Sequence, residues 1–130
     1  MLVKLLCLAL AGGMILLAQR APEEQSAELM SLEGRGKELF ARRCSGCHAL
    51  DLNKEGPRLR GVYGRAAARA PGFDYSEALK RASIRWDAAS LDRWLSDPGA
   101  MAPDTDMAFR LSDREERKAV IAYLKSVGNP

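Results

Sequence analysis

Three residues in the first half of the chain have the types and spacing to do chemistry: Cys44, Cys47 and His48. Thiols three positions apart can reach the two vinyl groups on one edge of a porphyrin and form thioethers, which carries the adjacent imidazole under the ring. The same thiols could instead close a disulfide or act as a thioredoxin-type redox pair. A zinc site would need two more ligands, and His48 is the only histidine in the chain. The Cys-x-x-Cys-His run therefore favours one covalently attached haem c.

Iron that is bound by one histidine keeps a sixth coordination position, for which methionine is the candidate ligand. Met30, Met101 and Met107 lie outside the apolar N-terminus. A methionine at helical spacing usually fills a core. Met107, however, follows the turn-forming run 102–106, and a loop can wrap the far side of a flat cofactor. Met101 is the local competitor, but this context favours Met107.

The N-terminus predicts export. Met1–Ala18 carries one charge, Lys4, followed by 14 residues of apolar character (5–18). This is the form of a secretory signal, and it is short for a spanning helix, which needs about 20 apolar residues. The Ala-x-Ala cleavage pattern is missing around residues 16–21, so two outcomes stay open for residues 1–21: a signal peptide, or an uncleaved anchor that tethers the protein through residues 1–18. We expect a periplasmic protein, either soluble or anchored to the outer face of the inner membrane, with a linker at 22–31 and a haem domain at 32–130.

Size and charge exclude several classes of function. A chain of 130 residues allows one compact domain rather than a multi-domain enzyme, and we expect a monomer. The formal net charge of +3 is too small for a nucleic-acid binder. The charges are unevenly distributed, because residues 54–85 hold eight bases and three acids while residues 86–116 hold three bases and eight acids. This asymmetry indicates either a charge dipole or merely a solvated surface.

The elements that must position these residues are predicted to be helices. One helix, with Gly36 and Phe40, leads into Cys44; a second spans 87–95; and a weaker one starts at Ser76. The last helix is predicted to begin at a capping box, Ser112-x-x-Glu115, and to stop at Gly128. Residues 49–74 are expected to form loops. No segment shows sustained strand alternation, so we predict an all-α domain. The last helix has an apolar stripe of Val120, Tyr123, Leu124 and Val127.

From Gly36 to Lys125 the sequence resembles the class I cytochromes c, the mitochondrial carrier and its short bacterial relatives. The resemblance implies a small helical domain wrapped around one haem, with an electron-transfer role and no enzymatic activity. The matching blocks run in order along the chain: Gly36-Lys37-Glu38-Leu39-Phe40, Cys44 to His48, Glu55-Gly56-Pro57-x-Leu59, Gly64-Arg65, Ala70-Pro71-Gly72-Phe73-x-Tyr75, Ile84-x-Trp86, Pro103-x-Thr105-x-Met107-x-Phe109 and Ile121-Ala122-Tyr123-Leu124-Lys125.

The resemblance also implies roles for single residues. His48 and Met107 match the axial ligands, and Pro57 matches the proline whose carbonyl accepts the hydrogen of the histidine Nδ1. Gly36 and Phe40 should meet the final helix near Tyr123. Arg65, Tyr75 and Trp86 match positions that contact the haem propionates. Thr105 matches a hydroxyl on the methionine side of the haem.

The chain departs from this pattern at several positions. Leu79 replaces an asparagine of the polar network around the propionates. Trp94 replaces a tyrosine that often hydrogen-bonds the methionine sulfur, and whether its indole reaches is left open. Three residues occupy positions where the mitochondrial carrier presents lysines: Gly99, Ala100 and Asp106.

The expected function is that of an electron carrier, with His/Met ligation, between partners such as a quinol–cytochrome c reductase and a terminal oxidase. Two alternatives remain: a haem subunit dedicated to one larger oxidoreductase, and a haem enzyme or gas-binding sensor. The second usually needs a distal histidine or arginine, and the chain has no second histidine.

Overall fold

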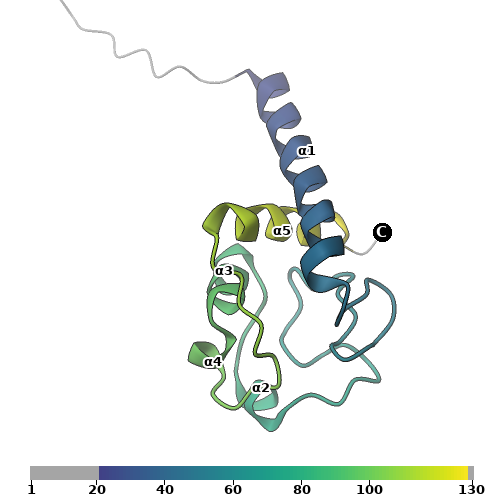
Figure 1. Ribbon diagram of the computed structural model, residues 1–130, viewed down its shortest axis with the longest axis vertical. Coiled ribbons are helices and arrows are strands. Elements are labelled where there is room, and N and C mark those ends of the chain that lie inside the picture. Colours follow the sequence, from purple (N-terminus) through teal and green to yellow (C-terminus); the bar gives the residue numbers. More distant parts are fainter. Residues whose placement is uncertain (1–20, 129–130) are drawn as a thin grey trace, which may run out of the picture.

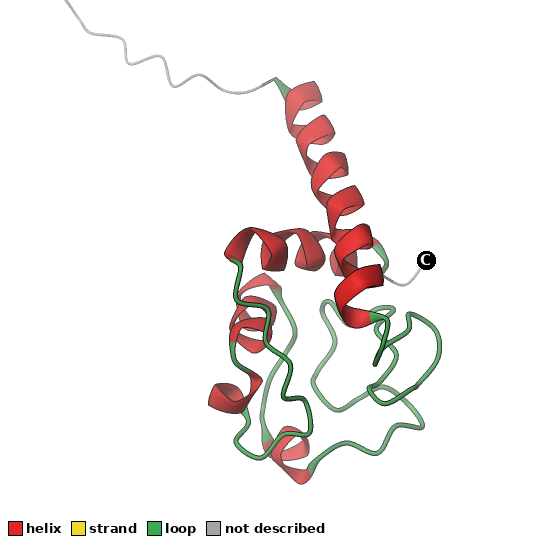
Figure 2. Cartoon of the chain, in the orientation of Figure 1, coloured by secondary structure: helices red, strands yellow, loops and turns green. Residues whose placement is uncertain are grey.

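The computed structural model describes residues 21–128, so the predicted leader lies almost entirely outside the described residues (Figure 1). The chain forms α1 (Pro22–Leu39), a π-helical turn (Phe40–Cys44), α2 (Glu77–Arg81), α3 (Ala88–Ser96), α4 (Pro98–Met101) and α5 (Arg114–Ser126). Within the described range there is no named strand, and an isolated bridge joins Ala66 to Arg85 (Figure 2). The predicted all-α class is confirmed.

The crossing of α1 and α5 organises the domain. A side chain at Gly36 would collide with the backbone of Ala119 and with Cβ of Tyr123, so only glycine allows the two helices to approach this closely. One turn further on, the Phe40 ring packs edge-on against Tyr123 with centroids 5.6 Å apart. The predicted meeting of Gly36 and Phe40 with the last helix is confirmed.

The segment 22–31, predicted as a linker, is helical and exposed throughout, and it forms the outer part of α1, which projects from the domain (Figure 1). The sequence explains the helix: Pro22 stands at its start, where a missing N–H costs nothing. Glu23 and Glu24 occupy the first turn, where negative charges interact favourably with the positive end of the helix dipole. None of the helices in residues 21–128 is both long and apolar enough to cross a membrane.

Side-chain caps mark the starts of α2, α3 and α5, and the one cap that the sequence predicted is misplaced by one residue. Asp87 caps α3 in a reciprocal box with Ser90, and the Ser76 hydroxyl caps α2. The predicted cap of the last helix at Ser112 is wrong, because the Asp113 carboxylate accepts from the backbone N–H of Glu116 at 2.8 Å and α5 begins one residue later. The same spacing is present at both positions, and the carboxylate is the better partner for the helix dipole.

Two walls enclose the interior of the domain. One wall consists of α3 and α5, whose buried faces include Leu91, Trp94, Leu95, Val120 and Leu124. The other is the long loop between the π-helical turn and α2, which follows the expectation for residues 49–74 (Figure 1). The segment 102–112 returns from α4 to α5 and carries Met107.

Candidate haem site

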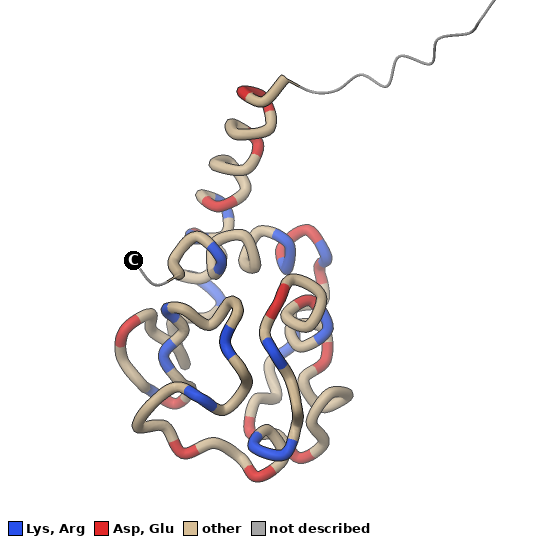
Figure 3. The backbone as a smooth tube through the Cα atoms, turned by 180° about the vertical axis from the view of Figure 1, so that it is seen from behind, with Lys and Arg blue, Asp and Glu red and all other residues tan. Residues whose placement is uncertain are grey.

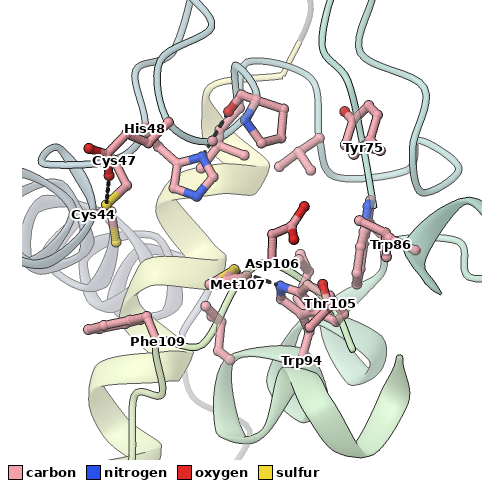
Figure 4. Close-up of a pocket in the computed structure, with 18 of the residues that line it drawn as sticks. Cys44, Cys47, His48, Tyr75, Trp86, Trp94, Thr105, Asp106, Met107 and Phe109 are labelled. Carbon is pink, nitrogen blue, oxygen red and sulfur yellow. Dashed lines mark hydrogen bonds between the residues drawn. The ribbon is translucent and has the colours of Figure 1, made fainter. Parts of the chain in front are cut away.

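A cavity of about 300 Å³ lies between the two walls and is lined mostly by apolar side chains. Met101, which ends α4, and Met30, which is 72% exposed, are not among the lining residues. The candidate ligand Met107 is among them. All nine residues predicted for the site line this single cavity, and Figure 4 labels them except Pro57 and Arg65: Cys44, Cys47, His48, Pro57, Arg65, Tyr75, Trp86, Thr105 and Met107.

The two cysteines lie next to one another at one end of the cavity, on the turn that ends the π-helical segment (Figure 4). Backbone N–H groups of Cys47 and His48 both donate to the Cys44 carbonyl, at 3.1 and 2.8 Å, which keeps the motif tight. Both thiols are free. Burial raises the pKa of Cys44 to about 11, and a hydrogen bond from Cys47 to Glu55 raises the pKa of Cys47. Neither thiol has the lowered pKa of a thioredoxin-type redox pair.

The His48 ring is oriented from two directions. Its Nδ1 lies 2.8 Å from the Pro57 carbonyl, which assigns the proton to Nδ1 and leaves the Nε2 lone pair for a metal. Gly56 packs directly on the ring, and a side chain there would overlap it. Burial lowers the pKa of His48, which keeps the imidazole neutral. The ring points into the cavity (Figure 4).

Met107 lies across the cavity on the segment 102–112, where Figure 4 shows its sulfur turned inward. The indole Nε1–H of Trp94 donates to the Met107 Sδ at 3.1 Å, so the indole reaches the position that the sequence left open. Leu79 is buried and lines the same cavity. It contributes apolar surface at the position where the resemblance implies an asparagine.

The cavity is also lined by a polar group of three residues, Arg65, Tyr75 and Trp86. The Arg65 guanidinium donates to the carbonyls of Arg60 and Arg58 at 3.1 and 3.2 Å, and burial lowers its pKa while the residue stays a cation. The buried Tyr75 hydroxyl accepts from Ala70 N–H at 3.0 Å and keeps its own hydrogen to donate. Trp86 lies nearby, edge-on to Trp94. A fixed cation with neighbouring donors in an otherwise apolar cavity suits a flat apolar group that bears carboxylates.

Sequence reasoning assigned no role to two residues that the structure places at the site. Gly56 supports the face of the His48 ring, and Glu55 accepts the hydrogen of the Cys47 thiol at 3.3 Å. The Gly-Pro pair was a signal for Gly56, because a glycine beside a ligand-orienting proline often marks close backbone approach. Glu55 belongs to a block that matches the family, but nothing in the sequence indicated its contact with the thiol.

The fold and the cavity define a class of protein: a small helical domain built around one haem that is attached through a Cys-x-x-Cys-His turn. The model of the family "Cytochrome c" matches residues 34–128, and the chain belongs to this family. It carries one covalently attached haem c, with Cys44 and Cys47 at the attachment positions, and it is a monohaem electron carrier rather than an enzyme.

Three relatives show the extent of the similarity. Cytochrome c of Euglena viridis is 42% identical over 96 residues, which cover 72% of this chain and 94% of that protein. The cytochrome c-type cyt cy of Rhodobacter capsulatus is 43% identical over 71% of this chain and 47% of its own length. The structure of cytochrome cH from Methylobacterium extorquens superposes with a TM-score of 0.69 at 41% identity, covering 72% of this chain and 97% of that one.

Proposed function

We propose that His48 and Met107 are the axial ligands of the haem iron, and that the protein carries electrons between larger redox complexes in the periplasm. The observation that carries the ligand assignment is the arrangement of the two side chains, which enter one cavity from different segments of the chain, His48 from the loop after the π-helical turn and Met107 from segment 102–112 (Figure 4). When bound there, the haem supplies one-electron Fe(III)/Fe(II) chemistry.

The residues of the cavity favour the reduced state. His48 is held neutral with its Nδ1 turned to the Pro57 carbonyl. Met107 offers a soft thioether, a ligand that raises the reduction potential. The Trp94 N–H withdraws electron density from that sulfur, and the apolar lining disfavours the additional positive charge of ferric iron.

We assign the polar group to the haem carboxylates. Arg65 supplies a half-buried cation, and Tyr75 has a free hydrogen to donate. Trp86 lines the cavity beside them, and the partly buried Thr105 hydroxyl lies on the Met107 side. The role of each is to satisfy a group that is costly to bury alone.

The protein partners we propose are a quinol–cytochrome c reductase as donor and a terminal oxidase as acceptor. The export pattern of residues 1–21 supports a periplasmic location, as a free carrier or as a tethered one. A dedicated subunit of one larger oxidoreductase is the second candidate, because the residues at the cavity would serve either role equally.

The ligand assignment is tested by Met107→Ala in the full-length holoprotein, with Met101→Ala as the matched control. Met107→Ala should abolish the weak near-infrared charge-transfer band of thioether-ligated ferric haem, lower the reduction potential, and allow cyanide or carbon monoxide to bind. Met101→Ala should leave band and potential unchanged. The reverse result would assign Met101. An unchanged spectrum in both variants would indicate an iron that is already open, as in an enzyme or gas sensor.

A further inference from the structure

Arg117 is a buried charged residue on α5, with only 10% of its side chain exposed. Its Nε donates to the Asp92 carboxylate on α3 at 2.7 Å. Its Nη1 donates to the carbonyls of Leu111 and Ser112 at 2.9 and 2.8 Å. One side chain therefore joins α5, α3 and the end of segment 102–112.

The same end of the segment is joined to α3 a second time, because the Leu111 backbone N–H donates to the Leu95 carbonyl at 2.7 Å. The α3 helix also carries Trp94, whose indole binds the Met107 sulfur. The segment that presents Met107 is thus fixed to α3 both at Met107 itself and four residues later, where Arg117 closes the attachment.

A planar guanidinium suits this task, since its donors point in fixed directions toward several acceptors at once. The arrangement differs from a surface ion pair at the arginine: Asp92 is 42% exposed, but Arg117 is buried and its hydrogen bonds are charge-assisted. The Arg110–Asp97 pair in the same region spans 2.9 Å, but its arginine side chain is 61% exposed, and water screens such pairs.

We propose that Arg117 and Asp92 are positioning residues for Met107: they fix the end of segment 102–112 and thereby set how readily the methionine leaves its place opposite His48. The inference rests on the proposed ligand role of Met107. A loose end would let the segment swing out while the rest of the fold stays intact, so an external ligand would compete more easily for the sixth position.

The test uses ferric, full-length holoprotein with Asp92→Asn and Arg117→Lys. Asparagine still fills the site and accepts a hydrogen bond, and lysine keeps the charge but cannot reach all three acceptors. The controls are Arg110→Gln, which breaks the exposed pair, and Asp104→Asn, which removes an exposed charge from the same segment. Three quantities are measured: hydrogen exchange of the Leu111 amide, the affinity for imidazole read from loss of the near-infrared band, and the free energy of global unfolding in denaturant.

Asp92→Asn and Arg117→Lys should each increase the exchange rate of the Leu111 amide and the apparent affinity for imidazole, both by about tenfold. These changes should be larger than the change in the free energy of global unfolding accounts for. The controls should change either quantity less than about threefold. Changes that only follow global stability, or that the controls reproduce, would overturn the proposal. Faster Leu111 exchange with unchanged imidazole affinity would also overturn it, and Met107→Ala would then show separately whether the ligand assignment itself stands.

Discussion

On the His48 side of the cavity, the ring is held by a partner nine residues along the same loop, the Pro57 carbonyl, and by the neighbouring Gly56. On the Met107 side, the sulfur is held by Trp94, 13 residues earlier on α3, and its segment by Arg117 on α5, whose partner Asp92 lies 25 residues away. The first arrangement is local in sequence, and the second depends on the packing of two helices. Local contacts survive partial opening of a fold better than distant ones, so we expect the Met107 side to open first.

The largest effect should come from removing an attachment point on the His48 side. Cys44→Ala or Cys47→Ala leaves one thiol, so double attachment of haem fails and the amount of stable holoprotein falls. Mass spectrometry and the pyridine haemochrome spectrum measure the number of thioethers. Cys7→Ala removes the third cysteine of the chain, which lies in the apolar N-terminus outside the motif, and should leave both thioethers intact. An unchanged haemochrome spectrum in the Cys44 or Cys47 variant would contradict attachment through this motif.

These two sides also differ in how well the sequence predicts them. The resemblance to the class I cytochromes c implied the contact of His48 with the Pro57 carbonyl, nine residues along the same loop, whereas the packing of Gly56 on the ring was not predicted. The reach of the Trp94 indole could not be predicted, since it depends on where α3 packs against the segment 102–112. Arg117 was not singled out, because nothing in the sequence distinguishes it from the exposed bases around it.

The remaining differences have equally local causes. Residues 22–31, predicted as a linker, form the outer part of α1, because residues with good helix propensity extend a helix that the domain has already nucleated. The start of α5 was misplaced by one residue because Ser112 and Asp113 both precede a glutamate by three positions.

A smaller loss is expected from Gly56→Ala. The added methyl group would overlap the His48 ring, which the bond to Pro57 prevents from moving freely. Overpacking of this kind costs about 1–3 kcal/mol, and we expect the free energy of unfolding of the holoprotein to fall by that amount in denaturant titrations. Gly46→Ala is the matched control, because no heavy atom lies within 4 Å of the new methyl group. Equal losses in both variants would show that packing on the ring is not the cause.

Trp94→Phe tests the hydrogen bond on the Met107 side and should act mainly on the reduction potential. Without the N–H, the sulfur donates more electron density to the iron, which stabilises the ferric state. We expect the reduction potential to fall by a few tens of millivolts, a shift that corresponds to a fraction of the free energy of one hydrogen bond. Redox titration measures the shift. Trp94→Tyr loses volume as well but offers an O–H donor, so its potential should stay closer to that of the parent. A fall of equal size in both variants would assign the effect to packing instead.

The smallest effect concerns docking to a redox partner, which depends on the charges around the cavity. The charged side chains that line the cavity are balanced, Arg43 and Arg65 against Glu55 and Asp106, and basic and acidic residues lie on both sides of the domain (Figure 3). Attraction between opposite charges is what makes association rates fall with salt. We therefore expect the rate of electron transfer with a strongly acidic partner to change less than about threefold between about 0.01 and 0.15 M ionic strength. Over this range the Debye length shrinks from about 30 to 8 Å.

Asp106→Lys changes a residue that lines the cavity and should make the salt dependence of the rate steeper. Asp104→Lys should steepen it less, because Asp104 does not line the cavity. Stopped-flow kinetics at several salt concentrations measure the slopes. A steep loss of rate in the unmodified protein would contradict the balanced surface and would place the docking face on Arg43 and the bases of residues 54–85.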